Sequence, residues 1–207
     1  TKVAYVSYEL GEADIFVYDT ATGIKRAVCT EPGNQAHPSI WGDIVVWEDY
    51  RTGYNPGIYA FDLNTGVERN AESGYNKPKK RPRIAGTLVV WEDYTGQDSG
   101  RMDADVRSFD FASGVYTTIA GTGANEMVPA TDGRFVVWAQ AASGGLDVMA
   151  RDTATGQTFT VRRQAGEQTL PAVGDGVTFW IDNVIGQPLH VDAYSLPGRR
   201  GLSFDPR

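Results

Sequence analysis

The sequence predicts an all-β protein: a β-propeller of five repeat units, each of about four antiparallel strands, with the first unit incomplete. Three observations predict this fold. The stretch DIVVWEDYRTG at 43–53 returns as TLVVWEDYTG at 87–96, and a proline precedes a tryptophan by nine positions in four segments. The 24 glycines and 10 prolines are also spread along the chain, which indicates many turns between short strands.

The proline and tryptophan positions set the length of one unit. The pairs are Pro38 with Trp47, Pro82 with Trp91, Pro129 with Trp138, and Pro171 with Trp180. Successive prolines are 44, 47 and 42 residues apart, and a four-stranded propeller blade takes about 40 to 50 residues. We therefore expect a single domain with units near 1–34, 35–78, 79–125, 126–167 and 168–207.

Each unit is expected to contain a proline strand, a tryptophan strand, an aspartate strand and a polar outer strand. The run VVW is typical of a strand buried on both faces. The aspartate strand follows the pattern of DIFVYDTATG, and its last glycine can adopt the positive φ of a tight turn. Glycines at 42, 86 and 133 predict a hairpin after each proline strand, whereas glycines at 174 and 176 predict an altered turn in the last unit.

A single sheet of this pattern has two apolar faces and must stack on its copies, and a propeller closes such a stack on itself. The tryptophans of the series are accordingly predicted to be buried between sheets. In the first unit VAYVSYE stands where IVVWE stands later, and we place Tyr8 at the tryptophan position.

The first unit has no proline strand before Val3. Five blades with one short by a strand is the plain interpretation. Alternatively the chain is part of a larger propeller, or another subunit supplies the strand. An open sheet edge attracts other strands, so we predict that the edge at 3–9 is covered by residues outside this chain or by a neighbouring molecule in a homomeric assembly.

The pattern P-x-I-x-G-x-x-V-V-W-E-D followed by D-I-Y-x-Y-D-x-x-T-G resembles the TolB-type β-propeller repeats of bacterial and archaeal envelope and secreted proteins. The likeness runs along nearly all of the chain and is strongest in PSIWGDIVVWEDYRTG and PRIAGTLVVWEDYTG. It implies the fold and an extracellular or envelope location. The family has no common reaction, so the likeness implies no catalytic residue.

Composition disfavours several classes of function. The net charge of −7 disfavours nucleic-acid binding, and no apolar run reaches the roughly 18 residues of a membrane span. Cys29 is the single cysteine, so no internal disulfide is expected, and we interpret it as a packed or free thiol in an outer strand. His37 and His190 belong to different units, which leaves little material for a zinc site or a catalytic triad.

The segment KPKKRPR is a candidate binding site in this acidic chain. Its basic residues are Lys77, Lys79, Lys80, Arg81 and Arg83. They could contact an anionic glycan, a phosphate-bearing polymer or a membrane surface, although a solvated loop between blades is the favoured interpretation. Trp41 lies outside the tryptophan series and is the candidate for an exposed aromatic platform.

Acidic residues form two further candidate sites. Glu48 with Asp49 and Glu92 with Asp93 follow the tryptophans, and paired carboxylates serve glycoside hydrolysis, but their recurrence with the fold favours a structural role. The loop DYTGQDSGRMDAD could bind calcium through Asp93, Asp98, Asp103 and Asp105. It lacks the EF-hand register, so a solvated acidic loop is favoured and no other cofactor is expected.

The leading functional hypothesis is a non-catalytic extracellular or envelope β-propeller module. It would serve as a scaffold or binding platform for a protein or polysaccharide, alone or within a larger assembly. The alternative is a secreted glycan-active hydrolase or lyase that uses carboxylates at the mouth of the propeller channel.

Overall fold

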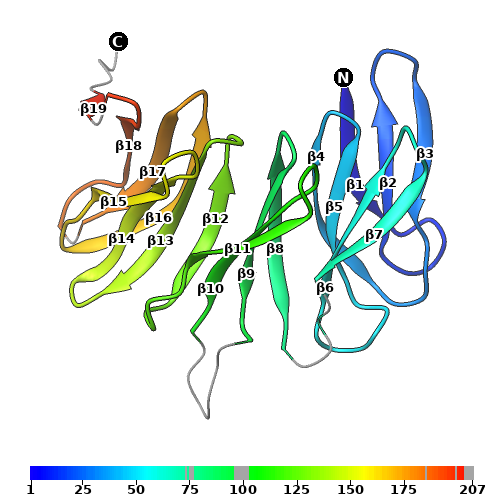
Figure 1. The fold of residues 1–207 in the computed structure, drawn as a ribbon, viewed down its shortest axis with the longest axis horizontal. Coiled ribbons are helices and arrows are strands. Elements are labelled where there is room, and N and C mark those ends of the chain that lie inside the picture. Colours follow the sequence, from blue (N-terminus) through cyan, green and yellow to red (C-terminus); the bar gives the residue numbers. More distant parts are fainter. Residues whose placement is uncertain (73, 75–76, 96–102, 185, 199, 203–207) are drawn as a thin grey trace.

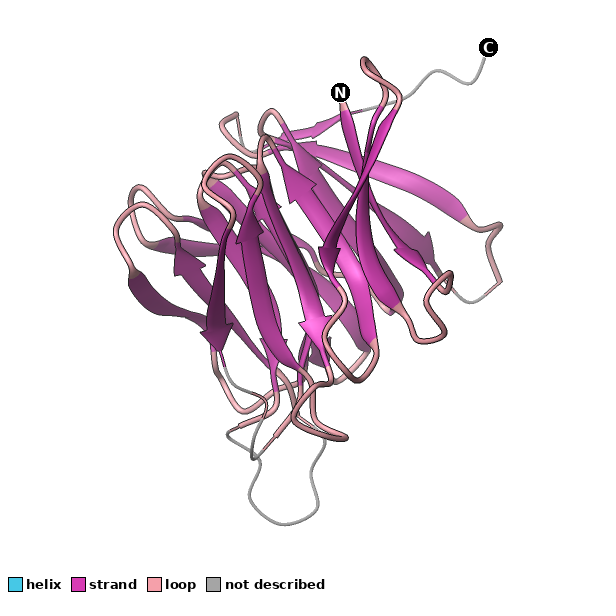
Figure 2. Cartoon of the chain, turned by 90° about the vertical axis from the view of Figure 1, so that its right-hand side faces the viewer, coloured by secondary structure: helices cyan, strands magenta, loops and turns pink. Residues whose placement is uncertain are grey.

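The computed structural model describes residues 1–72, 74, 77–95, 103–184, 186–198 and 200–202. These residues form nineteen β-strands and no helix (Figures 1 and 2). The all-β prediction is therefore confirmed. The described residues therefore contain no helix long and apolar enough to cross a membrane.

The strands form five consecutive antiparallel sheets. The first contains β1 (Lys2–Ser7), β2 (Asp14–Asp19) and β3 (Ile24–Cys29). The second contains β4 (Gln35–Trp41), β5 (Ile44–Asp49), β6 (Gly57–Asp62) and β7 (Val67–Glu72). The third contains β8 (Lys79–Ala85), β9 (Leu88–Asp93), β10 (Asp105–Asp110) and β11 (Val115–Ala120).

The fourth sheet contains β12 (Glu126–Thr131), β13 (Phe135–Ala142), β14 (Gly145–Asp152) and β15 (Gln157–Arg162). The fifth contains β16 (Gly166–Gly174), β17 (Val177–Asn183), β18 (His190–Ser195) and β19 (Arg200–Leu202). A short parallel pairing between β14 and β16 joins these two sheets. The strand order within each sheet follows the order in the chain, as predicted.

The sheets stand side by side in an arc, with the first sheet at one end and the fifth at the other (Figure 1). Neighbouring proline strands contact each other: β4 contacts β8, β8 contacts β12, and β12 contacts β16. They are therefore the inner strands of a propeller, and the polar strands β3, β7, β11 and β15 are the outer ones. The first sheet has no inner strand among the described residues, which confirms the incomplete first unit.

The core is divided into four clusters, one between each pair of neighbouring sheets. Trp47 lies in the cluster between the first and second sheets, Trp91 between the second and third, and Trp138 between the third and fourth. These three indoles and Trp180 are buried, as predicted. A buried indole contributes a large apolar area, so each junction holds its sheets together mainly by hydrophobic burial.

The tryptophan position of the first sheet belongs to Tyr5, so our assignment of Tyr8 was wrong. Trp47 is paired with Tyr59 across β5 and β6, and the corresponding pair in the first sheet is Tyr5 with Phe16. Tyr8 lies beyond β1 and is 71% exposed. The internal repeat aligned the Tyr-Glu dipeptide of VAYVSYE with Trp-Glu of the later units. Pairing with β2 instead places the tryptophan position three residues earlier, at Tyr5.

The turns follow the sequence pattern closely. Gly66 ends the aspartate-strand turn of the second sheet with a φ of 70°, and its amide donates to the carbonyl of Asp62 at 2.8 Å. In the turn between β16 and β17 of the last sheet, Asp175 and Gly176 have positive φ and Gly174 does not, so this turn is altered as predicted. Glycine is needed where φ is positive because a Cβ atom is poorly accommodated there.

Candidate functional site

Each inner strand carries the same β-bulge directly before its proline. The residues at this position all have positive φ: His37 (51°), Arg81 (54°), Val128 (51°) and Leu170 (50°). The pairing register shifts at each of them. Positive φ is uncommon outside glycine, above all for a β-branched residue, so neighbouring groups must hold this conformation.

Glu48 holds the bulge of the third sheet. Its Oε1 atom accepts a 2.7 Å hydrogen bond from the backbone amide of Arg81 and lies 2.9 Å from Nδ1 of His37. Its Oε2 atom accepts a 3.0 Å hydrogen bond from the hydroxyl of Tyr50. Glu48 is almost fully buried, and one carboxylate therefore connects the second sheet to the third.

Glu92 repeats this arrangement one sheet further along. Its Oε1 atom accepts from the backbone amide of Val128 at 2.7 Å and from Nη1 of Arg81 at 2.8 Å. Its Oε2 atom accepts from the hydroxyl of Tyr94 at 3.0 Å. Glu92 is fully buried, so this second carboxylate connects the third sheet to the fourth.

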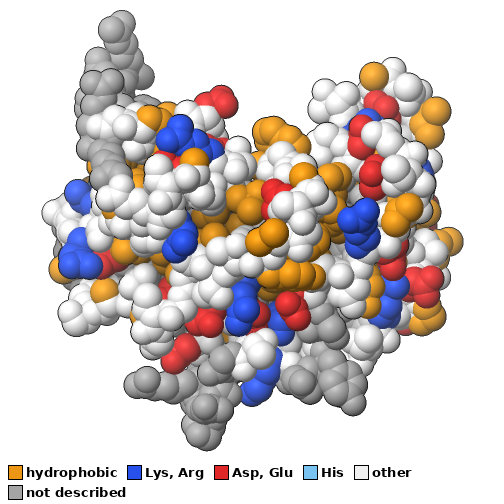
Figure 3. Space-filling model, viewed as in Figure 1, with side chains coloured by type: hydrophobic (Ala, Val, Ile, Leu, Met, Phe, Trp, Pro, Cys, Tyr) orange, Lys and Arg blue, Asp and Glu red, His pale blue; other side chains and the backbone are white. Residues whose placement is uncertain are grey.

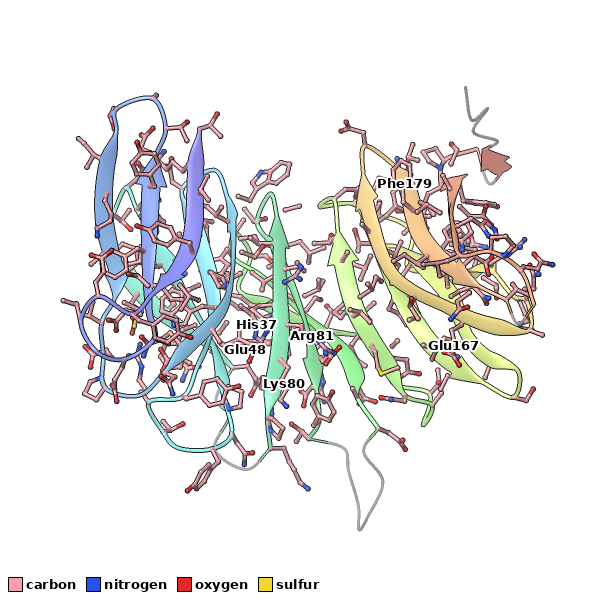
Figure 4. All side chains as sticks on the ribbon, turned by 180° about the vertical axis from the view of Figure 1, so that it is seen from behind. His37, Glu48, Lys80, Arg81, Glu167 and Phe179 are labelled. Atoms are coloured by element: carbon pink, nitrogen blue, oxygen red, sulfur yellow. The ribbon has the colours of Figure 1, made fainter. Side chains whose placement is uncertain are left out.

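The first, fourth and fifth sheets have no glutamate at the position of Glu48 and Glu92. By strand register, Val6 takes the place of Glu48 in the first sheet, Ala139 in the fourth and Ile181 in the fifth. None of these side chains can accept a hydrogen bond. The carboxylate arrangement is thus confined to the inner part of sheets two, three and four, where Figure 4 shows His37, Glu48 and Arg81 close together.

The exposed parts of this site are cationic or hydrogen-bonding groups. The side chain of His37 is 59% exposed and that of Arg81 is 47% exposed, whereas both glutamates are enclosed. Burial, and then the charge of Glu48, raise the pKa of Tyr50 to about 12. Burial and Glu92 likewise raise the pKa of Tyr94. The site therefore presents donors to solvent and keeps its acids inside.

Three of the carboxylates considered as catalytic acids or bases are buried and hydrogen-bonded. Glu48 and Glu92 already accept three contacts each and have almost no solvent access. Asp49 is buried as well, and it accepts from Nε1 of Trp47 at 2.8 Å and from Nη2 of Arg51 at 2.7 Å. None of these carboxylates is placed to exchange a proton with a substrate in solution.

The β-bulge of β8 divides the predicted basic site. Lys79 is buried, lies 3.4 Å from Asp93 and donates to Oγ1 of Thr95 at 2.6 Å, so it is part of the fold. Arg81 and Arg83 are exposed. Lys77 and Lys80 are half-buried, and the ammonium group of Lys80 lies 5.8 Å from the ring centre of Tyr94.

Trp41 ends β4 with an exposed indole, which is the environment that an aromatic platform needs. Cys29 is buried in β3, and burial raises the pKa of its thiol to about 12. A thiol in that environment stays protonated near neutral pH. Its interpretation as a packed thiol is therefore confirmed.

The predicted calcium ligands are placed only in part. Asp98 lies outside the described residues. Asp93 is buried between two cations, with Lys79 at 3.4 Å and Nε of Arg107 at 3.3 Å. Burial raises the pKa of Asp105 above its usual value. The solvated acidic loop stays the favoured interpretation of this segment, with calcium binding as the alternative.

One cluster, in the fifth sheet, was not predicted from the sequence. Asp182, His190 and Asp192 bring three potential metal ligands within 4.8 Å of one another, the single such group in the described part of the chain. The guanidinium of Arg162 lies 3.3 Å from Asp182 and 3.8 Å from Asp192, so a metal ion would have to compete with it. The signal was the spacing of His190 and Asp192, which places both on one face of a strand.

No protein-family model matches the sequence, and no curated protein matches it. Among solved structures, TolB from Acinetobacter baumannii superposes with a TM-score of 0.66 at 20% identity, over 96% of this chain and 50% of that one. A putative TolB from Agrobacterium tumefaciens gives a TM-score of 0.58 at 16% identity, over 77% and 60%.

An oligogalacturonate lyase, solved in complex with manganese, has a TM-score of 0.66 at 10% identity, over 96% of this chain and 61% of that one. The chain therefore spans about half the length of the Acinetobacter protein and less than two thirds of the other two. Identities this low relate folds rather than activities. The fold of the chain is a TolB-like β-propeller.

Proposed function

We propose that the protein is a non-catalytic β-propeller module of the cell envelope or the extracellular space that binds a protein or polysaccharide partner. One observation carries this proposal: Glu48 and Glu92, which follow the tryptophans of the second and third sheets, are buried and hold neighbouring sheets together. These two glutamates were candidates for acid or base catalysis, and their carboxylates are used for assembly of the fold instead.

The binding surface of this module is formed by β4 and β8. Arg81 and Arg83 are exposed on β8, Lys80 lies beside them, and Trp41 is exposed at the end of β4. Arg83 is exposed as a residue, but the surrounding protein partly desolvates its guanidinium group, and this desolvation, followed by the like charge of Arg81, lowers the pKa of Arg83. A negatively charged partner would relieve that repulsion between the two guanidinium groups. We therefore favour a partner that carries carboxylate or sulfate groups.

A binding assay with paired variants tests this assignment. The purified chain is titrated with polygalacturonate, an anionic polysaccharide, and with dextran, a neutral one. We expect Arg83→Gln and Trp41→Ala each to weaken polygalacturonate binding about tenfold, a loss of about 1.4 kcal/mol. The control is Lys25→Gln on the outer strand β3, which removes one exposed positive charge elsewhere.

Two results would count against the proposal. Cleavage of polygalacturonate, seen as new reducing ends or unsaturated products, would make the protein an enzyme. Equal loss of binding in Lys25→Gln and Arg83→Gln would reduce the interaction to general charge. Fractionation of cells of the natural host tests the location, and recovery of the protein in the cytoplasm would contradict it.

A further inference from the structure

The fifth sheet carries three potential metal ligands on one face. Asp182 of β17 pairs directly with His190 of β18, and Trp180 pairs with Asp192. Residues that pair across two strands, and residues two apart along one strand, share a face. One ligand atom from each of Asp182, His190 and Asp192 lies within 4.8 Å of the others. The guanidinium group of Arg162, from β15 of the fourth sheet, contacts both carboxylates, so the cluster lies at the junction of these two sheets.

This combination of an imidazole and two carboxylates does not recur with the fold. Strand register gives the residues that take the places of His190 and Asp192 in the earlier sheets. They are Asp14 and Phe16 in the first sheet, Gly57 and Tyr59 in the second, Asp105 and Arg107 in the third, and Asp147 and Met149 in the fourth. The propeller is therefore built without such a cluster in four of its sheets, and the cluster is a candidate for a function added to the fold.

The imidazole of His190 is oriented so that its Nε2 atom can bind a cation. Its Nδ1 atom lies 3.1 Å from the carbonyl oxygen of Pro188, and because a carbonyl oxygen can only accept, Nδ1 carries the proton. In the neutral ring Nε2 then has a lone pair, and it lies 3.7 Å from Oδ2 of Asp192. Two atoms with lone pairs repel each other unless a proton or a metal ion lies between them. A backbone carbonyl that fixes Nδ1 in this way is the usual support of a metal-binding histidine.

The buried carboxylate of the cluster is held by long contacts. Asp182 is fully buried, and its side chain accepts from Nε of Arg162 at 3.3 Å and from Nε2 of Gln168 at 3.2 Å. Asp49, at the same position in the second sheet, accepts from Nε and Nη2 of Arg51 at 2.9 and 2.7 Å. Hydrogen bonds between charged groups are usually about 2.7 to 2.9 Å long. Asp182 can therefore exchange its cation more readily than Asp49 can.

A buried oxygen atom beside Asp182 has no partner. Gln168 is fully buried, and within the described residues its Oε1 atom has no hydrogen-bond partner. Its counterpart Gln35 also leaves Oε1 without a partner, but directs its Nε2 atom to two backbone carbonyls, whereas Gln168 directs Nε2 to Asp182. An amide that turns by 180° exchanges its nitrogen and its oxygen. This turn would bring the Gln168 oxygen beside Asp182, where an ion would satisfy it.

We propose that Asp182, His190 and Asp192 form a site for a divalent transition-metal ion such as Zn²⁺, and that the ion replaces Arg162 as the cation of the cluster. An imidazole together with carboxylates suits zinc and its neighbours, whereas Ca²⁺ takes oxygen ligands. Ligands about 2.0 Å from a tetrahedral ion lie about 3.3 Å apart, so the three side chains need to move little. The side chains of His190 and Asp192 are 43% and 33% exposed, which lets an ion enter from solvent.

Arg162 is the group that the ion displaces. Its guanidinium lies 3.3 Å from Asp182 and 3.8 Å from Asp192, and it balances the charge of one carboxylate. Its side chain is 36% exposed and also donates to Gln164, so it can move toward solvent without leaving every partner. Figure 3 shows acidic and basic side chains together on the lobe that contains the fourth and fifth sheets. Metal binding would thus join β17 to β18 and add a free guanidinium to this surface of mixed charge.

This site belongs to the fifth sheet and does not depend on the partner proposed for β4 and β8. Zinc titration of the purified 207-residue chain, prepared without a histidine tag, tests it by calorimetry. We expect zinc to bind and to raise the thermal midpoint, and calcium at the same concentration to do neither. His190→Gln and Asp192→Asn should each weaken zinc binding about tenfold or more, because each variant removes a ligand.

Arg162→Gln separates a metal site from a purely structural ion-pair cluster. While Arg162 occupies the cluster, only a fraction of the molecules can accept the ion, so its removal should strengthen zinc binding about tenfold. The same variant should lower the thermal midpoint in chelator, because Asp182 then stays buried without a cation, and zinc should restore it. Arg163→Gln is the matched control, since that guanidinium contacts Asp147 instead, and its zinc affinity should be unchanged.

Three results would overturn the proposal. The first is equal zinc affinity in His190→Gln and the original chain. The second is a loss of binding confined to His37→Gln, which would place the ion at the other histidine. The third is weaker zinc binding in Arg162→Gln, which would show that the guanidinium does not compete with the ion. Asp192→Asn keeps the shape of its side chain, so its result decides the case if His190→Gln alters the fold.

Discussion

The second and fifth sheets have the same strand order and differ in their surroundings. Ile58 of the second sheet is fully buried, whereas Val191, its counterpart in the fifth, is mostly exposed. Nε1 of Trp47 donates to Asp49, whereas Nε1 of Trp180 has no hydrogen-bond partner in the described structure and Asp182 contacts Arg162 instead. Strand order is thus set within one repeat, while burial depends on the neighbouring repeats.

The largest effect is expected from loss of an indole in the second sheet. Trp47→Ala opens a cavity between the first two sheets, where the side chain is fully buried. We expect a loss of about 3 to 5 kcal/mol in the free energy of unfolding, measured by chemical denaturation. Trp41→Ala is the control, and its exposed site should limit the change to about 0.5 kcal/mol.

Loss of a carboxylate at the inner strands should be the next largest effect. Glu92→Ala removes the acceptor of the Val128 amide, of Arg81 and of the Tyr94 hydroxyl. Buried donors left without a partner cost about 1 to 3 kcal/mol. Glu167→Ala, at an exposed glutamate of the fifth sheet (Figure 4), is the matched control and should be close to neutral. Equal effects would show that the glutamate network does not stabilise the arc.

The difference in glycine conformation between these sheets can also be measured. Gly42 has a φ of 57°, whereas Gly174 does not have positive φ, and neither has an atom within 4 Å of an added Cβ. Gly42→Ala should therefore cost about 1 to 2 kcal/mol through backbone strain alone. Gly174→Ala should be neutral or slightly stabilising. The reverse order of thermal midpoints would contradict the assigned turns.

Alkaline pH should lower the free energy of unfolding through the Tyr-Glu contacts of the second and third sheets. The fifth sheet lacks this contact because Ile181 replaces the glutamate. The pKa of Tyr50 is raised from 10.0 to about 12, so the folded chain keeps this proton to higher pH than the unfolded chain does. Stability should therefore be unaffected by this group below about pH 10 and should fall as the pH rises from 10 to 12. Denaturation curves of Tyr50→Phe should show a shallower decline over this range, and an unchanged decline would contradict the assignment.

Calcium should have the smallest effect. The ammonium of Lys79 and the guanidinium of Arg107 already lie beside Asp93, so a divalent ion gains little there. We expect the thermal midpoint to be the same in calcium and in chelator. A rise with calcium that Asp105→Asn abolishes would instead establish an ion site at this loop.

The repeat predicted most of the fold because each landmark has a local cause. The tryptophans, the turn glycines and the outer strands could be assigned from spacing alone, and so could the missing inner strand. Tyr8 was assigned wrongly because two tyrosines lie three residues apart and only pairing with Phe16 distinguishes them. The register between two strands depends on pairing that the local sequence does not determine, so the residues around Tyr8 could not correct this assignment.

The site was less predictable because its contacts join residues far apart in the chain. Lys79 was counted among exposed basic residues, yet its strand places it opposite Asp93, which neutralises it. Glu48 was expected to have a structural role, but the group that it contacts was not predicted. That group is the amide of Arg81, which lies 33 residues away on the next sheet. A recurring Glu followed two residues later by Tyr was the available signal.

At the repeated bulge, backbone groups hold the sheets of the arc together, while the side chains differ from sheet to sheet. Four inner strands hold one backbone conformation, and at that position they carry an imidazole, a guanidinium, an isopropyl and an isobutyl group. The backbone amides of Arg81 and Val128, rather than their side chains, bond the glutamate of the preceding sheet. Side chains at these positions can therefore vary from one blade to the next while the frame stays constant. In evolutionary terms, a propeller of this kind can change what it recognises without first changing how it folds.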